Sequence, residues 1–155
     1  MIARPRLRTS LVTAICALTL ALPVASCGGD DSNQFREDYN AAVNNLSKIN
    51  SEIGSVSAGG AGQSNAAIAK ELDNIATAAD KARGGLAELD PPEDAKKEFD
   101  TLLAALETGV EDLRSMAKAA KSGDPEEAQA AAQELAKSGQ EITAAENALK
   151  TAVDG

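Results

Sequence analysis

The sequence contains no histidine and no tryptophan, and its only aromatic residues are one tyrosine and two phenylalanines. Without histidine, a serine or cysteine nucleophile lacks its usual activating base, and the Glu-x-x-His motifs of di-metal helical bundles cannot form. Two cysteines alone do not complete a zinc site, and no acidic spacing matches a calcium loop. A serine–lysine arrangement stays open, although no motif supports it. We therefore expect no metal, no cofactor and no catalytic activity.

Positive charge is also scarce, and its distribution divides the chain. Arg4, Arg6 and Arg8 precede an uncharged apolar run over residues 11–22, as in an export signal. The run is shorter than the roughly 20 residues that a helix needs to span a bilayer core, which favours cleavage over a permanent span. Cys16 lies inside this run, so the mature chain would hold only Cys27 and no internal disulfide.

The residues that follow form the most specific motif of the chain. Val24-Ala25-Ser26-Cys27 resembles the lipobox of bacterial lipoproteins, in which an aliphatic and two small residues precede a cysteine. The resemblance covers residues 1–27. It implies that Cys27 carries thioether-linked diacylglycerol, that residues 1–26 are removed, and that a fatty acid such as palmitate acylates the new amine. Two or three acyl chains give stable membrane anchoring.

The same resemblance predicts where the protein resides. It implies the extracytoplasmic face of the cell membrane, or the outer membrane if the organism has two. The alternative is an ordinary cleaved secretory signal with an incidental cysteine. Residues 27–32, which begin with the lipidated cysteine, are predicted to form a short tether resembling those of small helical actinobacterial lipoproteins.

The remaining chain is acidic and has the length of one domain. Once the three signal arginines are removed, twelve basic residues face 24 acidic ones, a formal net charge of −12. This charge argues against nucleic acid as a partner and against a position flat on anionic lipid headgroups.

Residues 33–155 show a helical pattern in which apolar residues recur alternately every four and three positions. The first two helices are predicted over residues 33–56, capped by Ser32, and over residues 64–89. The apolar seam of the first comprises Phe35, Tyr39, Ala42, Leu46, Ile49, Ile53 and Val56. The seam of the second comprises Ile68, Leu72, Ile75, Ala79, Ala82, Leu86 and Leu89.

Two proline turns introduce the other two helices. Asp90 is predicted to cap a helix that begins at Pro91, with Glu93 completing a capping box, and Asp124 to cap one that begins at Pro125 after Gly123. The third seam comprises Ala95, Phe99, Leu102, Leu106, Gly109, Leu113, Met116 and Ala120, flanked by Leu103, Val110 and Ala117. The fourth comprises Ala128, Ala131, Leu135, Ser138, Ile142, Ala145, Leu149 and Ala152. The third face is the widest, so we expect this helix to be the most buried.

Long helices joined by short turns run antiparallel to their neighbours. The sequence therefore predicts an all-α, up-down-up-down four-helix bundle with coiled-coil-like seams. A dimer of helical hairpins would bury the same residues and stays open as the alternative.

The charged residues fall outside the seams. Glu93/Lys97, Lys96/Asp100, Lys137/Glu141 and Glu146/Lys150 are spaced for exposed pairs four residues apart, and no inward carboxylate is expected. Glu107 and Glu111 form a like-charged pair that suggests a weak cation site, but a solvated face with Arg114 nearby explains it better.

Small residues mark one further feature. Gly109 and Ser138 lie at similar distances from the turn at Gly123, so they should face each other between the third and fourth helices. Close helix packing is the simpler interpretation, and a narrow apolar ligand pocket is the alternative.

These observations predict a non-catalytic envelope lipoprotein, held at the membrane through Cys27, whose helices bind another envelope component. The alternative function is a carrier or sensor of a small apolar ligand within the bundle. The oligomeric state, the partner and the ligand are not specified by the sequence.

Overall fold

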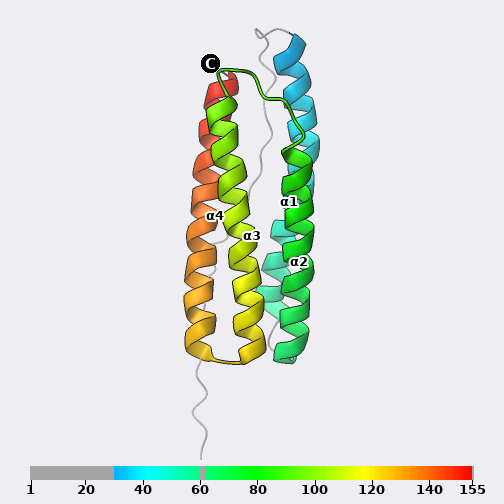
Figure 1. Ribbon diagram of the computed structural model, residues 1–155. Coiled ribbons are helices and arrows are strands. Elements are labelled where there is room, and N and C mark those ends of the chain that lie inside the picture. Colours follow the sequence, from blue (N-terminus) through cyan, green and yellow to red (C-terminus); the bar gives the residue numbers. More distant parts are fainter. Residues whose placement is uncertain (1–29, 60–61, 155) are drawn as a thin grey trace, which may run out of the picture.

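A computed structural model describes residues 30–59 and 62–154, which form four α-helices. They are α1 (Asp30–Gly59), α2 (Asn65–Leu86), α3 (Lys96–Ser122) and α4 (Pro125–Asp154). Each helix runs antiparallel to the next along the chain, and the four pack side by side as a bundle (Figure 1). The predicted all-α four-helix bundle is confirmed. The predicted signal and Cys27 lie outside the described residues.

The two ends of the bundle differ in what they contain. The upper end, as drawn in Figure 1, holds the start of α1, the connection over residues 87–95 and the end of α4. The lower end holds the end of α1, the start of α2 and the tight α3–α4 turn. At the upper end, Arg36 Nη2 of α1 lies 3.1 Å from Asp154 Oδ1 of α4, so the first and last helices meet there.

The apolar seams point inward as predicted. Every seam position in the four helices is buried or half-buried, and α3 has the largest number of buried residues among α2, α3 and α4. Helix α3 packs closely along both α2 and α4, whereas α1 packs less extensively, mainly along α2. The most apolar helix is therefore the one at the centre of the packing.

The interior consists of an upper and a lower core of different composition. The upper core contains all three aromatic residues of the sequence, with Phe35 stacked on Tyr39 and edge-on to Phe99. The lower core contains mainly aliphatic side chains and alanine, among them Ile49, Leu72 and Leu113, and the half-buried Met116 packs against it. The bulky side chains are thus concentrated at the upper end, between α1, α3 and α4.

Helix α1 is longer than predicted at both ends. It begins at Asp30, so Ser32 lies inside the helix and is not its cap, and residues 30–32 are not a tether. Helix α2 begins after Ser64, whose Oγ accepts a hydrogen bond from the Ala67 N–H, and ends at Leu86, directly after Gly84-Gly85 and three residues earlier than predicted.

The predicted capping box at Asp90 is wrong. Helix α3 begins at Lys96, its cap position is Ala95, and no side chain caps it. A residue that precedes proline is disfavoured in the α region, so Pro92 keeps Pro91 from starting a helix. The chain instead crosses the upper end and makes a turn in which the Ala95 N–H bonds to the Pro92 carbonyl at 2.9 Å.

The α3–α4 turn is formed as predicted. Gly123 ends α3 in the left-handed conformation with φ of 73°, which glycine adopts at little cost. Asp124 Oδ1 then accepts hydrogen bonds from the Glu126 and Glu127 N–H groups at 2.8 and 3.3 Å, so Asp124 caps α4.

Within residues 30–59 and 62–154, no helix is both long and apolar enough to cross a membrane.

Candidate functional site

Gly109 and Ser138 face each other between α3 and α4, as the sequence predicted. A Cβ atom at Gly109 would lie 3.9 Å from Ser138 Oγ and 3.1 Å from Ile142 Cδ1. Ser138 is 2% exposed, and its hydroxyl donates to the Leu135 carbonyl at 3.1 Å, which satisfies the hydroxyl within its own helix. Ile142 therefore occupies the space that the absent Gly109 side chain leaves, a geometry that favours close packing.

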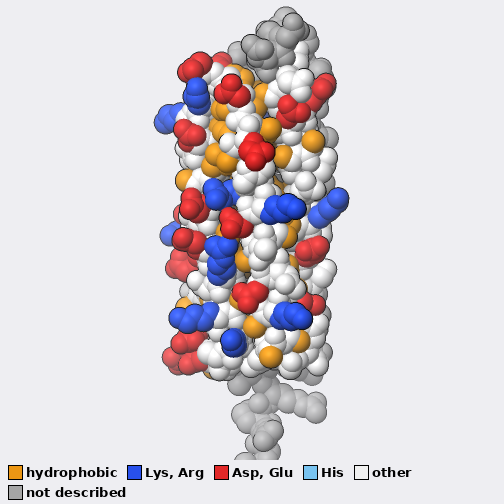
Figure 2. Space-filling model, turned by 45° about the vertical axis from the view of Figure 1, so that its right-hand side comes forward, with side chains coloured by type: hydrophobic (Ala, Val, Ile, Leu, Met, Phe, Trp, Pro, Cys, Tyr) orange, Lys and Arg blue, Asp and Glu red, His pale blue; other side chains and the backbone are white. Residues whose placement is uncertain are grey.

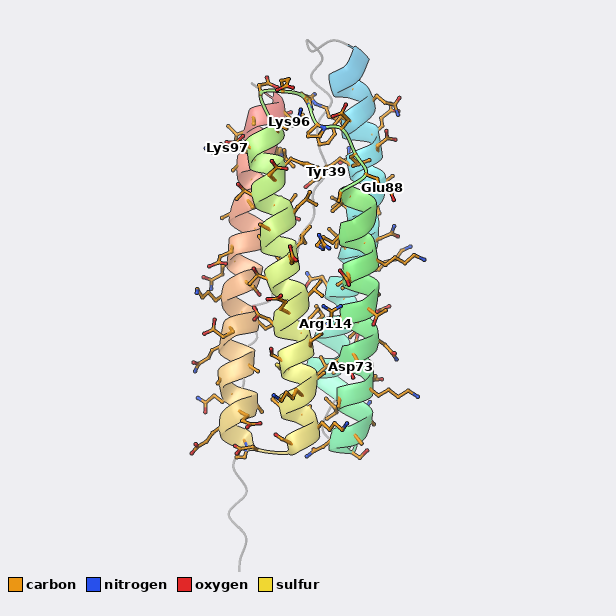
Figure 3. The ribbon with its side chains drawn as sticks, viewed as in Figure 1. Tyr39, Asp73, Glu88, Lys96, Lys97 and Arg114 are labelled. Carbon is orange, nitrogen blue, oxygen red and sulfur yellow. The ribbon has the colours of Figure 1, made fainter. Side chains whose placement is uncertain are left out.

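Most of the predicted surface charge pairs rearrange. Lys137 and Glu141 pair at 3.9 Å, but Glu93 pairs with Lys96 at 3.0 Å instead of with Lys97. The carboxylate of Glu93 accepts a hydrogen bond from Lys96 Nζ and raises the pKa of that ammonium. The start of α3, where Lys96 and Lys97 are labelled, is shown in Figure 3.

Glu107 and Glu111 are both exposed, which agrees with a solvated face. Their neighbour Arg114 reaches across to α2, where its Nη2 lies 2.9 Å from Asp80 Oδ2. In the described part of the chain, no group of three or more acidic or cysteine side chains is arranged to hold a metal ion.

Glu146 contradicts the prediction that no carboxylate points inward. It is 4% exposed, and it makes neither a pair with Lys150 nor a hydrogen bond with another described residue. Its position beside Ala145 and between Ile142 and Leu149 places it at the edge of the α4 seam. The sequence shows that Glu146 adjoins the apolar seam of α4. It does not show that Phe35 and Tyr39 of α1 cover this side of the seam.

A small cavity of about 20 Å³ lies between α1 and α4 at this level. It is lined by Phe35, Arg36, Tyr39, Glu146, Leu149, Lys150, Val153 and Asp154. Figure 3 shows Tyr39 in the upper half of the bundle, among the helices. The cavity therefore has a mostly apolar wall, and Glu146, Tyr39 and Arg36 are the polar and charged residues of the buried contact around it.

The cations around the cavity do not pair with Glu146. Arg36 Nη2 donates to the Val153 carbonyl and lies 3.1 Å from Asp154 Oδ1, so its charge is directed toward the end of α4. Arg36 Nε is buried and has no hydrogen-bond partner among the described residues. At this contact the described residues thus give Arg36 Nε no hydrogen bond and Glu146 no ion pair.

Burial governs the ionisation of both acids in the cavity. Loss of solvation disfavours the carboxylate and raises the pKa of Glu146 from 4.5 to about 7. Burial also raises the pKa of the Tyr39 hydroxyl above its ordinary value, and the negative charge of Glu146 adds to this shift. Glu146 therefore changes its charge near neutral pH, while Tyr39 stays protonated there.

A second, wider hollow opens at the upper end, between the start of α1 and the α2–α3 connection. This groove measures about 420 Å³ and is lined by Gln34, Phe35, Asp38, Leu89, Asp90, Pro91, Pro92, Glu93 and Lys96. Its walls mix acidic, proline and aromatic surface, which differs from the mostly apolar lining that is usual for small-molecule sites.

Comparisons of the chain with protein-family models, with curated proteins and with solved structures find no match.

Proposed function

We propose that the protein is a lipid-anchored, non-catalytic lipoprotein of the cell envelope whose bundle is an interaction module for another envelope component. The observation that carries the proposal is the lipobox-like Val24-Ala25-Ser26-Cys27 after an uncharged apolar run. It lies three residues before the start of α1 at Asp30. An acyl group on Cys27 would therefore attach almost directly to a folded helix.

The short distance from Cys27 to α1 orients the bundle in this proposal. Three residues span at most about 11 Å when fully extended. The upper end, with the groove and the α1–α4 cavity, would then lie next to the membrane, and the α3–α4 turn would lie farthest from it. The long sides of α1–α4 would remain accessible to a partner.

The surface chemistry supports a protein partner over a polyanion. Figure 2 shows acidic and basic side chains interspersed along one face, with hydrophobic side chains visible between them. No single-sign basic patch is seen on that face, and the net charge of the whole chain is −9. A mixed surface of this kind suits a protein partner better than nucleic acid.

The anchor is tested by exchanging each cysteine in turn. Cys27→Ser should move the protein from the membrane fraction to the soluble fraction and abolish the mass of the acyl group on the N-terminal peptide. Cys16→Ser, within the predicted signal, is the matched control and should change neither measurement. Membrane association of the Cys27→Ser variant equal to that of the native protein would contradict the anchor.

Native mass spectrometry of protein released gently from the host envelope separates the two candidate functions. A complex with a second protein supports the interaction module. A reproducible small extra mass on the monomer supports the carrier alternative instead. The position of Ile142 beside Gly109 favours close packing over an apolar pocket there, so the carrier requires this side chain to move.

A further inference from the structure

Helix α4 is held much less extensively by α1 than by α3. Near the upper end, the polar part of the α1–α4 contact is supplied by Arg36, which donates to the Val153 carbonyl and pairs with Asp154 at 3.1 Å. Its apolar part brings Phe35 and Leu149 into one core cluster. Elements with few packed contacts open at a lower free energy than the rest of a protein. The α1–α4 contact is therefore the one that separates most readily along α4.

This weak contact contains an acidic residue. Glu146 is 4% exposed and lies on the side of α4 that Phe35 and Tyr39 of α1 cover. The walls of the cavity beside it are mostly apolar. A protonated carboxyl is tolerated in such surroundings, whereas a carboxylate loses hydration that it regains when the helices part. Ionisation of Glu146 therefore favours separation of α1 from α4.

The titratable and charged side chains around Glu146 do not remove this effect. In the part of the chain that the structure describes, those that line the cavity come from α1 and α4 and not from α2 or α3. From α1, Arg36 is directed toward Asp154, and the pKa of Tyr39 is raised by burial, so its hydroxyl stays neutral. From α4, Lys150 lies one turn after Glu146 but forms no ion pair with it, and Asp154 adds a second acidic group.

We propose that the upper α1–α4 contact is a pH-sensitive switch, which is closed while Glu146 is neutral and opens when Glu146 ionises. In the open form, the part of α1 that carries Phe35 and Tyr39 leaves α4, while α3 keeps its contacts with α2 and α4. Burial raises the pKa of Glu146 from 4.5 to about 7, so the contact is closed in acid and opens as the pH rises through neutrality. The switch does not depend on the anchor at Cys27, and either proposal can fail without the other.

Amide hydrogen exchange of the purified protein tests the switch. The measured quantity is the protection factor, corrected for the intrinsic effect of pH on exchange, of α1 over residues 35–43 and of α3 over residues 99–113. We expect the protection of residues 35–43 to fall by at least about tenfold from pH 5 to pH 8, because the closed contact retains a proton that the open one releases. At pH 8, α1 should be protected at least about tenfold less than α3, because α1 opens without the other helices.

Two variants assign the effect to Glu146. Glu146→Gln keeps the size of the side chain and does not ionise, so residues 35–43 should keep at pH 8 the protection that they have at pH 5. Glu141→Gln, an exposed substitution on the same helix, is the control and should behave as the native protein does.

Three results would overturn the switch. Equal protection of α1 and α3 at pH 8 would show that the helices separate only in global unfolding. Protection of α1 that does not change with pH would show that the contact accommodates the charge of Glu146, for instance by pairing with Lys150. A loss of protection that persists in Glu146→Gln would assign the pH dependence to another group.

Discussion

Helix α4 meets α3 on one side and α1 on the other, and the two contacts are built from side chains of very different size. Toward α3 it presents Ser138 and Ile142 beside Gly109, and the two backbones approach closely. Toward α1 it presents Glu146, Leu149 and Val153 opposite Phe35 and Tyr39, and the backbones stay farther apart. One contact is close, and the other is wide and contains a small cavity and the buried Glu146.

The difference shows how side-chain volume sets the spacing between helices. Interaxial distances vary with the residues at the contact, so glycine, serine and alanine allow a closer approach than aromatic rings do. Aromatic rings are large and rigid, so they hold two helices apart, whereas small residues let the helices come closer. The wide contact is also the one at which an acidic residue, Glu146, is buried.

Enlarging Gly109 should break the close contact and produce the largest effect. A Cβ there would already lie 3.1 Å from Ile142 Cδ1, so the rest of a leucine side chain has no room. We expect Gly109→Leu to lower the free energy of unfolding by about 2–3 kcal/mol, as measured by denaturant titration. Unchanged stability, together with loss of a bound small molecule, would instead support the apolar pocket and the carrier function.

Neutralising Glu146 should reveal the wide contact through its pH dependence. The pKa of Glu146 is about 7 in the folded protein against 4.5 when exposed, so the folded state retains a proton that the unfolded state has released. The stabilising contribution is complete below about pH 4.5, declines as the pH rises to about 7, and is lost above it. We expect the native protein to lose on the order of 2 kcal/mol across this window relative to Glu146→Gln.

The comparison requires unfolding curves for both proteins at several pH values between 4 and 8. The other charged groups at the cavity, Arg36, Lys150 and Asp154, are present in both proteins and cancel in the difference. Glu141→Gln, at an exposed position of the same helix, should follow the native profile. If the difference in unfolding free energy between the native protein and Glu146→Gln stays constant with pH, Glu146 ionises in the folded protein as a solvent-exposed residue does.

Replacing a glycine that lies outside both contacts should change the free energy of unfolding least. The change should be a stabilisation, opposite in sign to the effect of Gly109→Leu. Gly139 lies in the middle of α4, and a Cβ there would have no atom within 4 Å. We expect Gly139→Ala to raise the free energy of unfolding by about 0.5–1 kcal/mol, because alanine has the higher helix propensity. Comparing the unfolding free energies of Gly139→Ala and Gly109→Leu separates the effect of helix propensity from the effect of the space available to a side chain. Destabilisation by Gly139→Ala would show that another part of the protein contacts that face of α4.

The features that could be predicted from the sequence are those set by local chemistry and by periodicity. Gly123 and Asp124 form the turn expected of them because a left-handed glycine and an aspartate cap need only their nearest neighbours. The seams point inward because the spacing of apolar residues fixes one face of a helix. The facing positions of Gly109 and Ser138 followed from counting residues on either side of this turn.

The features that were missed depend on which helix lies beside which. The periodicity of α4 shows on which side of the helix Glu146 lies. It does not show that α1 covers this side, because the covering residues, Phe35 and Tyr39, lie more than 100 residues earlier in the chain. At Asp90, the capping pattern was present, but the second proline prevented a helix start and moved it to Lys96. The buried carboxyl is thus a tertiary property that a single-helix pattern does not reveal.

The confinement of the aromatic residues to the upper core has a spectroscopic consequence. Tyr39 is the only tyrosine and there is no tryptophan, so near-ultraviolet fluorescence of the protein arises at the α1–α4 contact. Far-ultraviolet circular dichroism, in contrast, samples the helices of both cores. Melting curves recorded by the two methods would coincide if the bundle unfolds as one unit, and would separate if α1 leaves α4 before the alanine-rich lower half unfolds.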